Sequence, residues 1–479
     1  MREAPVAEAL WTAQGVAAAV SGDASAAFDV HGIAIDSREV RRGDLFVALR
    51  GEQQDGHRYI GDALARGAAG ALVERGAAWP EGAPVIAVDD TLAGLQALGA
   101  ASRARLSGTV IGVTGSVGKT GTRTAIAAAL ERSGGTYASE RSFNNHVGVP
   151  LTLARTPAAT DYAVLEMGMN HAGEMRALTG IARPDVALVT TIAPVHMEFF
   201  SSIEEIADAK AEIFEGVEPG GVAVLNRDNP MYDRLAARAL ECGVTRTVGF
   251  GVSASAEVRL LKSRLLEDCS TVSADVAGTL VTYKVGIPGE HWVANSLAVL
   301  AVVQAVGGDL GLAGLALADL QPPRGRGRRH RVDFRDAEIL VIDESYNASP
   351  VAVAAALRTL AQTKLPHRRG RRIAVLGDMR ELGAQAPAMH EALIAPLSDA
   401  GVEIVVAVGP LMGAMAADLG DGIQAVACDT AADATRQVLD LVQPGDAVMV
   451  KGSNAIGLSA VVEALLALQN HAGRRRRAI

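Results

Sequence analysis

One stretch of the chain constrains its fold more than any other, the twelve residues TVIGVTGSVGKT from Thr109 to Thr120. The β-branched residues at its start predict a buried strand. A turn containing Gly115 and Gly118 follows, and the Ala-rich stretch Thr122–Leu130 predicts a helix. A strand, a glycine turn and a helix N-terminus form a cradle for anions, because free backbone N–H groups and the helix dipole point into the turn.

The residues of the turn indicate which anion it holds. Lys119 supplies a positive charge for phosphate oxygens, and the hydroxyl of Thr120 can hold Mg²⁺. The two glycines are closer together than in the common G-x4-G-K-S/T loop, and an ordinary Gly-rich turn is the alternative. Strand, Gly-Lys-Thr and helix in this order favour a nucleoside triphosphate site, made by Gly115, Ser116, Val117, Gly118, Lys119 and Thr120.

Length and composition narrow the class of protein. A chain of 479 residues suggests about three domains. The net charge of −9 argues against nucleic acid as a partner. Three widely separated cysteines form neither a disulfide framework nor a zinc motif, which fits a reducing compartment. The sequence shows neither a signal peptide nor an apolar run of about 18 residues, so we expect a cytoplasmic enzyme without a membrane span.

The distribution of strand-like and helical segments predicts an α/β protein with three domains, at residues 1–90, 91–321 and 322–479. Residues 1–90 contain short βα units. In 91–321, strand-like runs alternate with helical ones, which predicts a mainly parallel, doubly wound sheet. The Pro/Arg-rich stretch 321–329 precedes a third segment of alternating strands and helices, expected to be Rossmann-like.

Polar residues at or just after the predicted strands are candidates for chemistry, because ligands of such sheets bind beyond the carboxyl ends of the strands. Glu166 is placed where a nucleotide enzyme needs a carboxylate for Mg²⁺. His196 follows the next strand, but a single histidine is more often structural. Lys210 would ordinarily be a hydrated helix lysine. A polar cluster with Ser37 and Arg38 fits either a ligand site or a hydrated loop.

Several motifs together resemble the Mur ligases, the ATP-dependent amide-forming enzymes of peptidoglycan assembly. The resemblance lies in Thr114–Thr120, Glu166–Gly168, Ala193–His196 and Lys210–Phe214. Three further stretches are similar to the branch of the family that adds D-alanyl-D-alanine: Asn144–Thr152, Asp343–Pro350 and Gly377–Gly383. The branch that adds the third amino acid would instead show Tyr-Ala-His and Asp-Asn-Pro-Arg stretches in the third domain, and this sequence has neither there.

The resemblance implies a role for each matching residue. It assigns Lys119 to the phosphates, Thr120 and Glu166 to one Mg²⁺, and His196 and Lys210 to a second Mg²⁺, with Lys210 carbamylated by CO₂. It implies that the nucleotide is contacted by His291, Asn295, Arg326 and Glu344. It implies that the substrates are contacted by Ser37, Arg38, Asn144, Asn145, Tyr346 and Asn347. Two positions depart from the family pattern, since Glu344 replaces an aspartate and Asn454 an arginine.

The implied reaction joins D-alanyl-D-alanine to UDP-N-acetylmuramoyl-tripeptide through an acyl phosphate, giving the UDP-pentapeptide, ADP and phosphate. The first domain would bind the UDP substrate, and a monomer is expected. Two rivals stay open. A folylpolyglutamate-type ligase shares the ATPase core but would lack a UDP-binding domain like residues 1–90. A nucleotide-controlled switch would hydrolyse ATP without needing a carboxylate and an amine. Whether the third peptide residue is diaminopimelate or lysine is left open.

Overall fold

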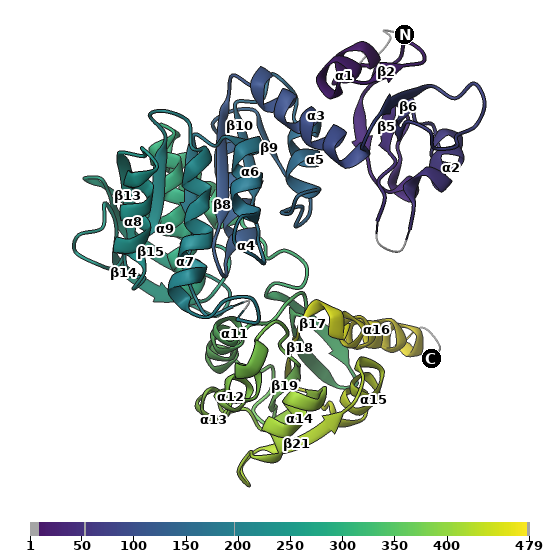
Figure 1. Ribbon diagram of the computed structural model, residues 1–479. Helices are drawn as coiled ribbons and strands as arrows, with labels where there is room; N and C mark the ends of the chain where they lie inside the picture. Colours follow the sequence, from purple (N-terminus) through teal and green to yellow (C-terminus); the bar gives the residue numbers. More distant parts are fainter. Residues whose placement is uncertain (1–8, 52–53, 196, 477–479) are drawn as a thin grey trace.

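The computed structural model describes residues 9–51, 54–195 and 197–476. It contains sheets of five, nine and six strands and a two-stranded ribbon, and the larger sheets follow one another along the chain from the purple to the yellow end (Figure 1). The predicted α/β class and three-domain architecture are confirmed. Among the described helices, none is long and apolar enough to cross a bilayer.

The N-terminal sheet has the strand order β2-β7-β6-β5-β4, in which only β2 is antiparallel to its neighbour. Its strands are β2 (Asp23–Ala24), β4 (Gly32–Ala34), β5 (Asp44–Val47), β6 (Gly70–Glu74) and β7 (Val85–Val88). The ribbon pairs β1 (Trp11–Thr12) with β3 (Asp29–Val30). The helical elements are α1 (Ala13–Val20), η1 (Ser37–Glu39), η2 (Gly56–Tyr59) and α2 (Ile60–Ala65).

The core of the N-terminal sheet extends into two helices that follow it in sequence, α3 (Thr91–Arg105) and α5 (Gly148–Arg155). Leu151 and Ala154 of α5 are buried in the same cluster as the strands β4 to β7. The indole N–H of Trp11 donates a buried hydrogen bond to the Ala154 carbonyl at 2.9 Å. Arg155 donates to the Ile33 carbonyl at 2.7 Å. The N-terminal sheet is therefore tied to α5 by packing and by hydrogen bonds.

The central sheet has the order β16-β15-β14-β13-β12-β11-β8-β10-β9. It is parallel from β9 to β14 and ends in two antiparallel strands. Its strands are β8 (Thr109–Thr114), β9 (Thr136–Ala138), β10 (Tyr162–Glu166), β11 (Val186–Val189), β12 (Val222–Asn226), β13 (Arg246–Gly251), β14 (Val258–Leu265), β15 (Ser270–Val276) and β16 (Thr279–Val285). The expectation of a mainly parallel sheet is confirmed.

Helices cover the central sheet on both faces (Figure 1). They are α4 (Lys119–Leu130), α6 (Glu174–Ala182), α7 (Ile203–Ala211), η3 (Glu212–Gly216), α8 (Tyr232–Glu241), α9 (Glu290–Ala305) and α10 (Leu310–Asp319). The helix after the glycine turn begins at Lys119, three residues earlier than the predicted start at Thr122. Gly118 is its N-cap with φ of +86°, a conformation that glycine adopts without strain, so the turn ends directly in the helix.

The C-terminal sheet has the order β17-β18-β22-β19-β20-β21, with only β17 antiparallel. Its strands are β17 (Arg328–Phe334), β18 (Ala337–Glu344), β19 (Arg372–Gly377), β20 (Ile404–Val408), β21 (Gln424–Cys428) and β22 (Ala447–Lys451). The helical elements are α11 (Pro350–Gln362), η4 (Gly383–Gln385), α12 (Ala386–Glu391), α13 (Ile394–Asp399), α14 (Pro410–Ala417), α15 (Ala431–Leu441), η5 (Asn454–Ile456) and α16 (Ser459–Arg476).

Candidate active site

The glycine turn between β8 and α4 is fixed by the segment that follows β11. Gly115 has φ of +142°, and a side chain there would collide with the Thr190 hydroxyl. That hydroxyl donates to the Val117 carbonyl at 2.6 Å. The Ser116 hydroxyl donates to the Ala193 carbonyl at 3.0 Å. The turn is therefore held in one shape before any ligand binds, and no side chain caps the N-terminus of α4.

Lys119 folds back over this turn, where its Nζ donates to the Gly115 carbonyl at 2.6 Å. Burial lowers the pKa of the Lys119 ammonium, Glu166 opposes this shift, and Arg326 adds to it. The three charges therefore lie within electrostatic reach of one another, although they come from α4, from β10 and from the linker before β17. Such a group of mostly positive charge suits a polyphosphate.

Glu166 ends β10 beside the turn and is 1% exposed. Its Oε1 accepts a hydrogen bond from Asn144 Nδ2 at 2.8 Å, and its Oε2 has no hydrogen-bond partner among the described residues. Thr120 is also buried, with its hydroxyl 3.5 Å from that of Ser142. The side-chain amide of Asn144, which was expected to contact substrate, is hydrogen-bonded to Glu166 in this structure. Carboxylate and hydroxyl oxygens are ligands that Mg²⁺ accepts, so Glu166 and Thr120 together fit such an ion.

Lys210 lies near the end of α7 and is completely buried. Its Nζ has no hydrogen-bond partner within the described parts of the chain. Burial, with a contribution from the charge of Lys119, lowers the pKa of Lys210 well below its usual value. The hydrated surface lysine that composition alone favours is therefore contradicted. A neutral amine is the form that adds to CO₂, so the environment of Lys210 fits carbamylation.

His196, the remaining metal ligand that the resemblance implies, lies outside the described residues. Within the described ranges, three or more His, Cys, Asp or Glu side chains do not gather anywhere as a metal site. The proposed ligands would not form such a group, because a threonine hydroxyl and a lysine carbamate are not His, Cys, Asp or Glu side chains. The fit to a metal therefore depends on oxygen donors from Thr120, Glu166 and a modified Lys210.

The nucleotide-side residues His291 and Asn295 lie one turn apart on α9, so they share one face of the helix. A side chain added at Gly118 would lie 3.2 Å from Asn295 Oδ1, which places this face directly against the phosphate turn. Burial lowers the pKa of the His291 imidazole, which favours the neutral form of the ring. A neutral ring can accept a hydrogen bond from a purine amino group.

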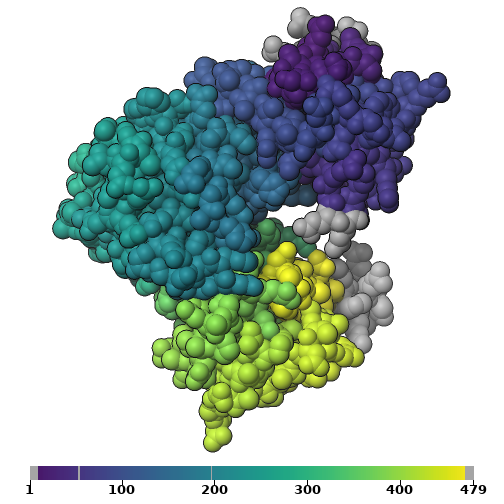
Figure 2. Space-filling model, in the orientation of Figure 1, coloured from purple at the N-terminus to yellow at the C-terminus, as the bar shows by residue number. Residues whose placement is uncertain are grey.

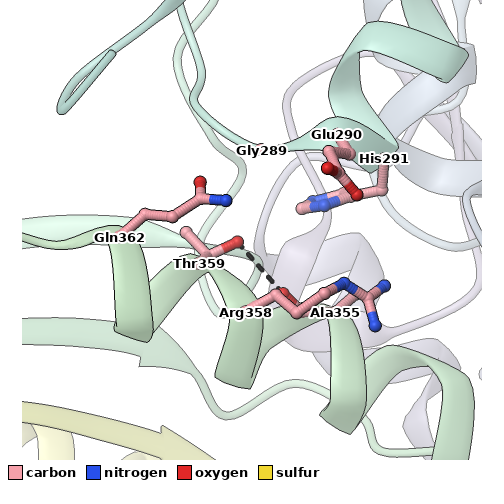
Figure 3. Close-up of a pocket in the computed structure, with 7 residues that line it drawn as sticks. All are labelled: Gly289, Glu290, His291, Ala355, Arg358, Thr359 and Gln362. Atoms are coloured by element: carbon pink, nitrogen blue, oxygen red, sulfur yellow. Dashed lines mark hydrogen bonds between the residues drawn. The ribbon is translucent and has the colours of Figure 1, made fainter. Parts of the chain in front are cut away.

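A small pocket separates the start of α9 from α11, so it lies between the central and C-terminal domains. Figure 3 shows the His291 ring in the space between these two helices. The pocket is lined by Gly289, Glu290, His291, Ala355, Arg358, Thr359 and Gln362. A neighbouring pocket is lined by both His291 and Glu344, so residues expected on the nucleotide side from two domains meet there.

The C-terminal candidates are held by contacts within their own domain. The Arg326 guanidinium lies 4.3 Å from the centre of the Tyr346 ring. Glu344 pairs with Lys451 at 3.0 Å, and the same Nζ donates to the Asn347 carbonyl at 3.1 Å. Lys451 is 4% exposed, and its ion pair holds the Glu344 carboxylate in place at the pocket wall.

The N-terminal candidates Ser37 and Arg38 lie at the protein surface in η1. Arg38 forms an ion pair with Asp36 at 2.6 Å, and the Arg38 hydrogen bonds lower the pKa of Asp36 to about 2. Asn145, expected to touch substrate, accepts a hydrogen bond at 2.9 Å from the N–H of Gly148, the first residue of α5.

Three residues of this region were absent from the sequence predictions: Arg123, Thr190 and Lys451. Arg123 comes four residues after Lys119, a spacing that puts both on one face of α4 and could have indicated a shared site. Thr190 acts through contacts with the glycine turn, and a Thr-Thr pair after a strand gives no such signal. Lys451 pairs with Glu344 because the two are register partners on β22 and β18.

Comparison with known proteins identifies the class. Residues 29–103 match the catalytic domain of the Mur ligase family, residues 113–303 the Mur ligase middle domain, and residues 327–454 the Mur ligase glutamate ligase domain. The chain belongs to the Mur ligase family, and it is an ATP-dependent, amide-bond-forming ligase. The resemblance predicted from the motifs is confirmed.

Within this family, the chain is similar to proteins of one branch over nearly its whole length. It is 33% identical to UDP-N-acetylmuramoyl-tripeptide--D-alanyl-D-alanine ligase of Escherichia coli K12, over 90% of this chain and 93% of that protein. MurF from Acinetobacter baumannii has a TM-score of 0.81 at 29% identity, covering 95% of this chain and 98% of that one. MurF from Thermotoga maritima, solved in complex with ADP, has a TM-score of 0.76 at 27% identity, covering 92% and 98%.

Proposed function

We propose that this Mur ligase joins D-alanyl-D-alanine to UDP-N-acetylmuramoyl-tripeptide, with ATP converted to ADP and phosphate. The observation that supports this substrate pair most strongly is the full-length similarity to relatives that bear this activity in their names. The site described above supports the ATP-dependent part, because its phosphate turn lies beside a buried carboxylate, Glu166, and a buried amine, Lys210.

The proposed chemistry activates a carboxylate that is otherwise a poor acyl donor, because its leaving group would be oxide. The tripeptide carboxylate oxygen attacks the γ-phosphorus, the bond to the bridging oxygen breaks, and ADP leaves. The dipeptide amine then attacks the acyl carbon through a tetrahedral intermediate. Collapse breaks the carbon–oxygen bond, phosphate leaves, and the amine loses a proton as the amide forms.

The central domain would supply the charge stabilisation for these steps. Lys119 would neutralise the transferring phosphoryl group. Thr120 and Glu166 would hold one Mg²⁺, and carbamylated Lys210, with His196, would hold a second. When bound, these ions neutralise charge on the phosphoryl group and orient its oxygens. Carbamylation suits Lys210 because it turns an amine without a hydrogen-bond partner among the described residues into an anionic oxygen donor.

The remaining roles extend the proposal over three regions, 1–90, 91–321 and 322–479. The first would bind the UDP moiety, with Ser37 and Arg38 as contacts. His291, Asn295, Arg326 and Glu344 would contact the nucleotide, and Tyr346 and Asn347 would line the substrate side. Asn144 and Asn145 would also contact the substrate, with Asn144 placed beside Glu166 by its hydrogen bond to that carboxylate. The enzyme would work in the cytoplasm as a monomer.

Phosphate release should depend on both acceptor substrates. We expect ATP alone to give little phosphate, and ATP with UDP-tripeptide and D-alanyl-D-alanine to give phosphate and pentapeptide in equal amounts, because the acyl phosphate is made only for an amine to consume. A coupled assay with the diaminopimelate and the lysine UDP-tripeptides, each with and without the dipeptide, measures this. Full phosphate release from enzyme and ATP alone would favour the nucleotide switch, and activity with a folate and glutamate would favour the other rival.

Ligand binding should close the C-terminal domain onto the rest of the protein, since Figure 2 shows a hollow between the N-terminal and C-terminal parts. The linker glycines are bound to the C-terminal domain. Gly325 N–H donates to Asp343 Oδ2 at 2.9 Å, and Gly327 N–H to the Asp343 carbonyl at 2.8 Å. Bending is therefore expected before them, in residues 321–324.

Small-angle X-ray scattering measures this closure. The radius of gyration should fall when a non-hydrolysable ATP analogue and the UDP-tripeptide are added together, because closure excludes water from the acyl phosphate. D-alanyl-D-alanine alone serves as the control. A scattering profile that does not change with both ligands present would contradict the closure.

A further inference from the structure

A buried cation close to the phosphate turn has no role in the chemistry above. Arg123 lies on α4 one turn after Lys119 and is 6% exposed. Its Nη1 donates a hydrogen bond to the Ser139 carbonyl. Its Nε lies 3.9 Å from Glu166 Oε2. The guanidinium thus points from the phosphate-turn helix toward the end of β10.

The two atoms of this ion pair, Arg123 Nε and Glu166 Oε2, lie too far apart for a hydrogen bond. Neither Arg123 Nε nor Glu166 Oε2 has a hydrogen-bond partner among the described residues, and both atoms are buried. The other oxygen of the carboxylate is held by Asn144. A buried charge is costly unless an opposite charge compensates it, and Glu166 is the carboxylate that forms an ion pair with Arg123. The Glu166 carboxylate is therefore held by a neutral amide, Asn144, on one oxygen and by a cation, Arg123, on the other.

We propose that Arg123 is a positioning residue for Glu166. With Asn144, it sets the orientation of the carboxylate that the proposed function assigns to Mg²⁺, and the inference rests on that assignment. Outer partners of metal-ligating groups fix the ligand's direction and contribute to metal affinity. Arg123 also donates to the Ser139 carbonyl, and this second contact anchors the guanidinium beside Glu166.

The test measures metal binding rather than turnover. Mn²⁺, titrated into the full chain with a non-hydrolysable ATP analogue, is followed by the electron paramagnetic resonance signal of the free ion. Arg123→Met should weaken Mn²⁺ binding by about 10- to 100-fold, the usual cost of losing an outer-shell partner. Arg123→Lys should recover part of this loss, because an ammonium restores the charge opposite Glu166. If the methionine variant does not fold, Arg123→Gln takes its place.

A matched control separates positioning from the general cost of removing a buried arginine. Arg103 is 8% exposed and donates to the Ala182 and Arg183 carbonyls, away from Glu166. Arg103→Met should lower the thermal unfolding midpoint, as Arg123→Met does, but leave Mn²⁺ affinity unchanged. Equal Mn²⁺ affinity in Arg123→Met and the parent protein would overturn the proposal.

A double substitution shows whether Arg123 acts through Glu166. Glu166→Gln should itself weaken Mn²⁺ binding, and adding Arg123→Met should cause little further loss, because the group that Arg123 orients is gone. A full, additive loss in the double variant would overturn the positioning role while leaving the metal assignment intact. Unchanged Mn²⁺ affinity in Glu166→Gln alone would instead overturn the metal assignment, and the role of Arg123 with it.

Discussion

Lys210→Ala is expected to lower ligase turnover by more than about 100-fold, because even an outer-shell partner of a metal ligand is worth about 10- to 100-fold. If Lys210 carries the proposed carbamate, the variant loses an anionic oxygen donor to the metal. Formate or acetate should restore part of the activity, since a short carboxylate can enter the vacated space and offer the same kind of oxygen. Initial rates of pentapeptide formation with and without added carboxylate measure both effects.

Lys262→Ala is the matched control, because Lys262 is exposed on β14. It should keep full activity and show no response to formate. A lysine at position 210 with only a packing role would give an alanine variant of lower thermal stability that no carboxylate rescues. Full activity in Lys210→Ala would reject the metal role outright. A crystal structure showing extra density on the Lys210 Nζ would establish the carbamate directly.

Lys119→Ala is expected to lose about 10²- to 10³-fold in turnover, the cost of removing one preorganised group that stabilises charge in the transition state. The amine already lies over the glycine turn, with its Nζ 2.6 Å from the Gly115 carbonyl, so little reorganisation precedes its contact with phosphate. Steady-state kinetics at saturating ATP, UDP-tripeptide and dipeptide measure the loss.

Lys284→Ala, which removes an exposed lysine on β16, controls for the loss of one positive charge from the protein. It should turn over like the parent enzyme. The Lys119→Ala variant should still fold, as judged by circular dichroism, because among the described residues Lys119 Nζ bonds only to backbone carbonyls of the adjacent glycine turn. Near-normal turnover in Lys119→Ala would contradict the assignment of the glycine turn as a phosphate-binding site.

Local sequence was enough to predict the glycine turn, since a strand, two glycines and a helix occur within one short stretch. It predicted the start of α4 three residues too late, because an Ala-rich composition marks the body of a helix. The first turn is instead set by Gly118, whose positive φ lets the helix begin at Lys119.

Burial and side-chain pairing could not be predicted from local sequence in the same way. Lys210 lies in a helix with several acidic residues, and only the packing of α7 against the central sheet makes it a buried amine. Asn144 and Glu166 are 22 positions apart and meet because the end of β10 reaches the segment before α5. For Lys210 and Asn144 the family resemblance was the only signal in the sequence, whereas Glu166 was also indicated by its place at the end of a predicted strand. Neither signal gave the contacts between side chains.

The N-terminal sheet closes its core over α5, which has consequences for how such enzymes can be recombined. A chimaera that exchanges residues 1–90 for those of a relative keeps the original Leu151 and Ala154, which must then fit a foreign sheet. The indole hydrogen bond of Trp11 to Ala154 would also have to be reproduced. Residues 1–90 of this chain can therefore be transplanted as a compatible unit only together with α3 and α5, so the unit of exchange is larger than the N-terminal sheet.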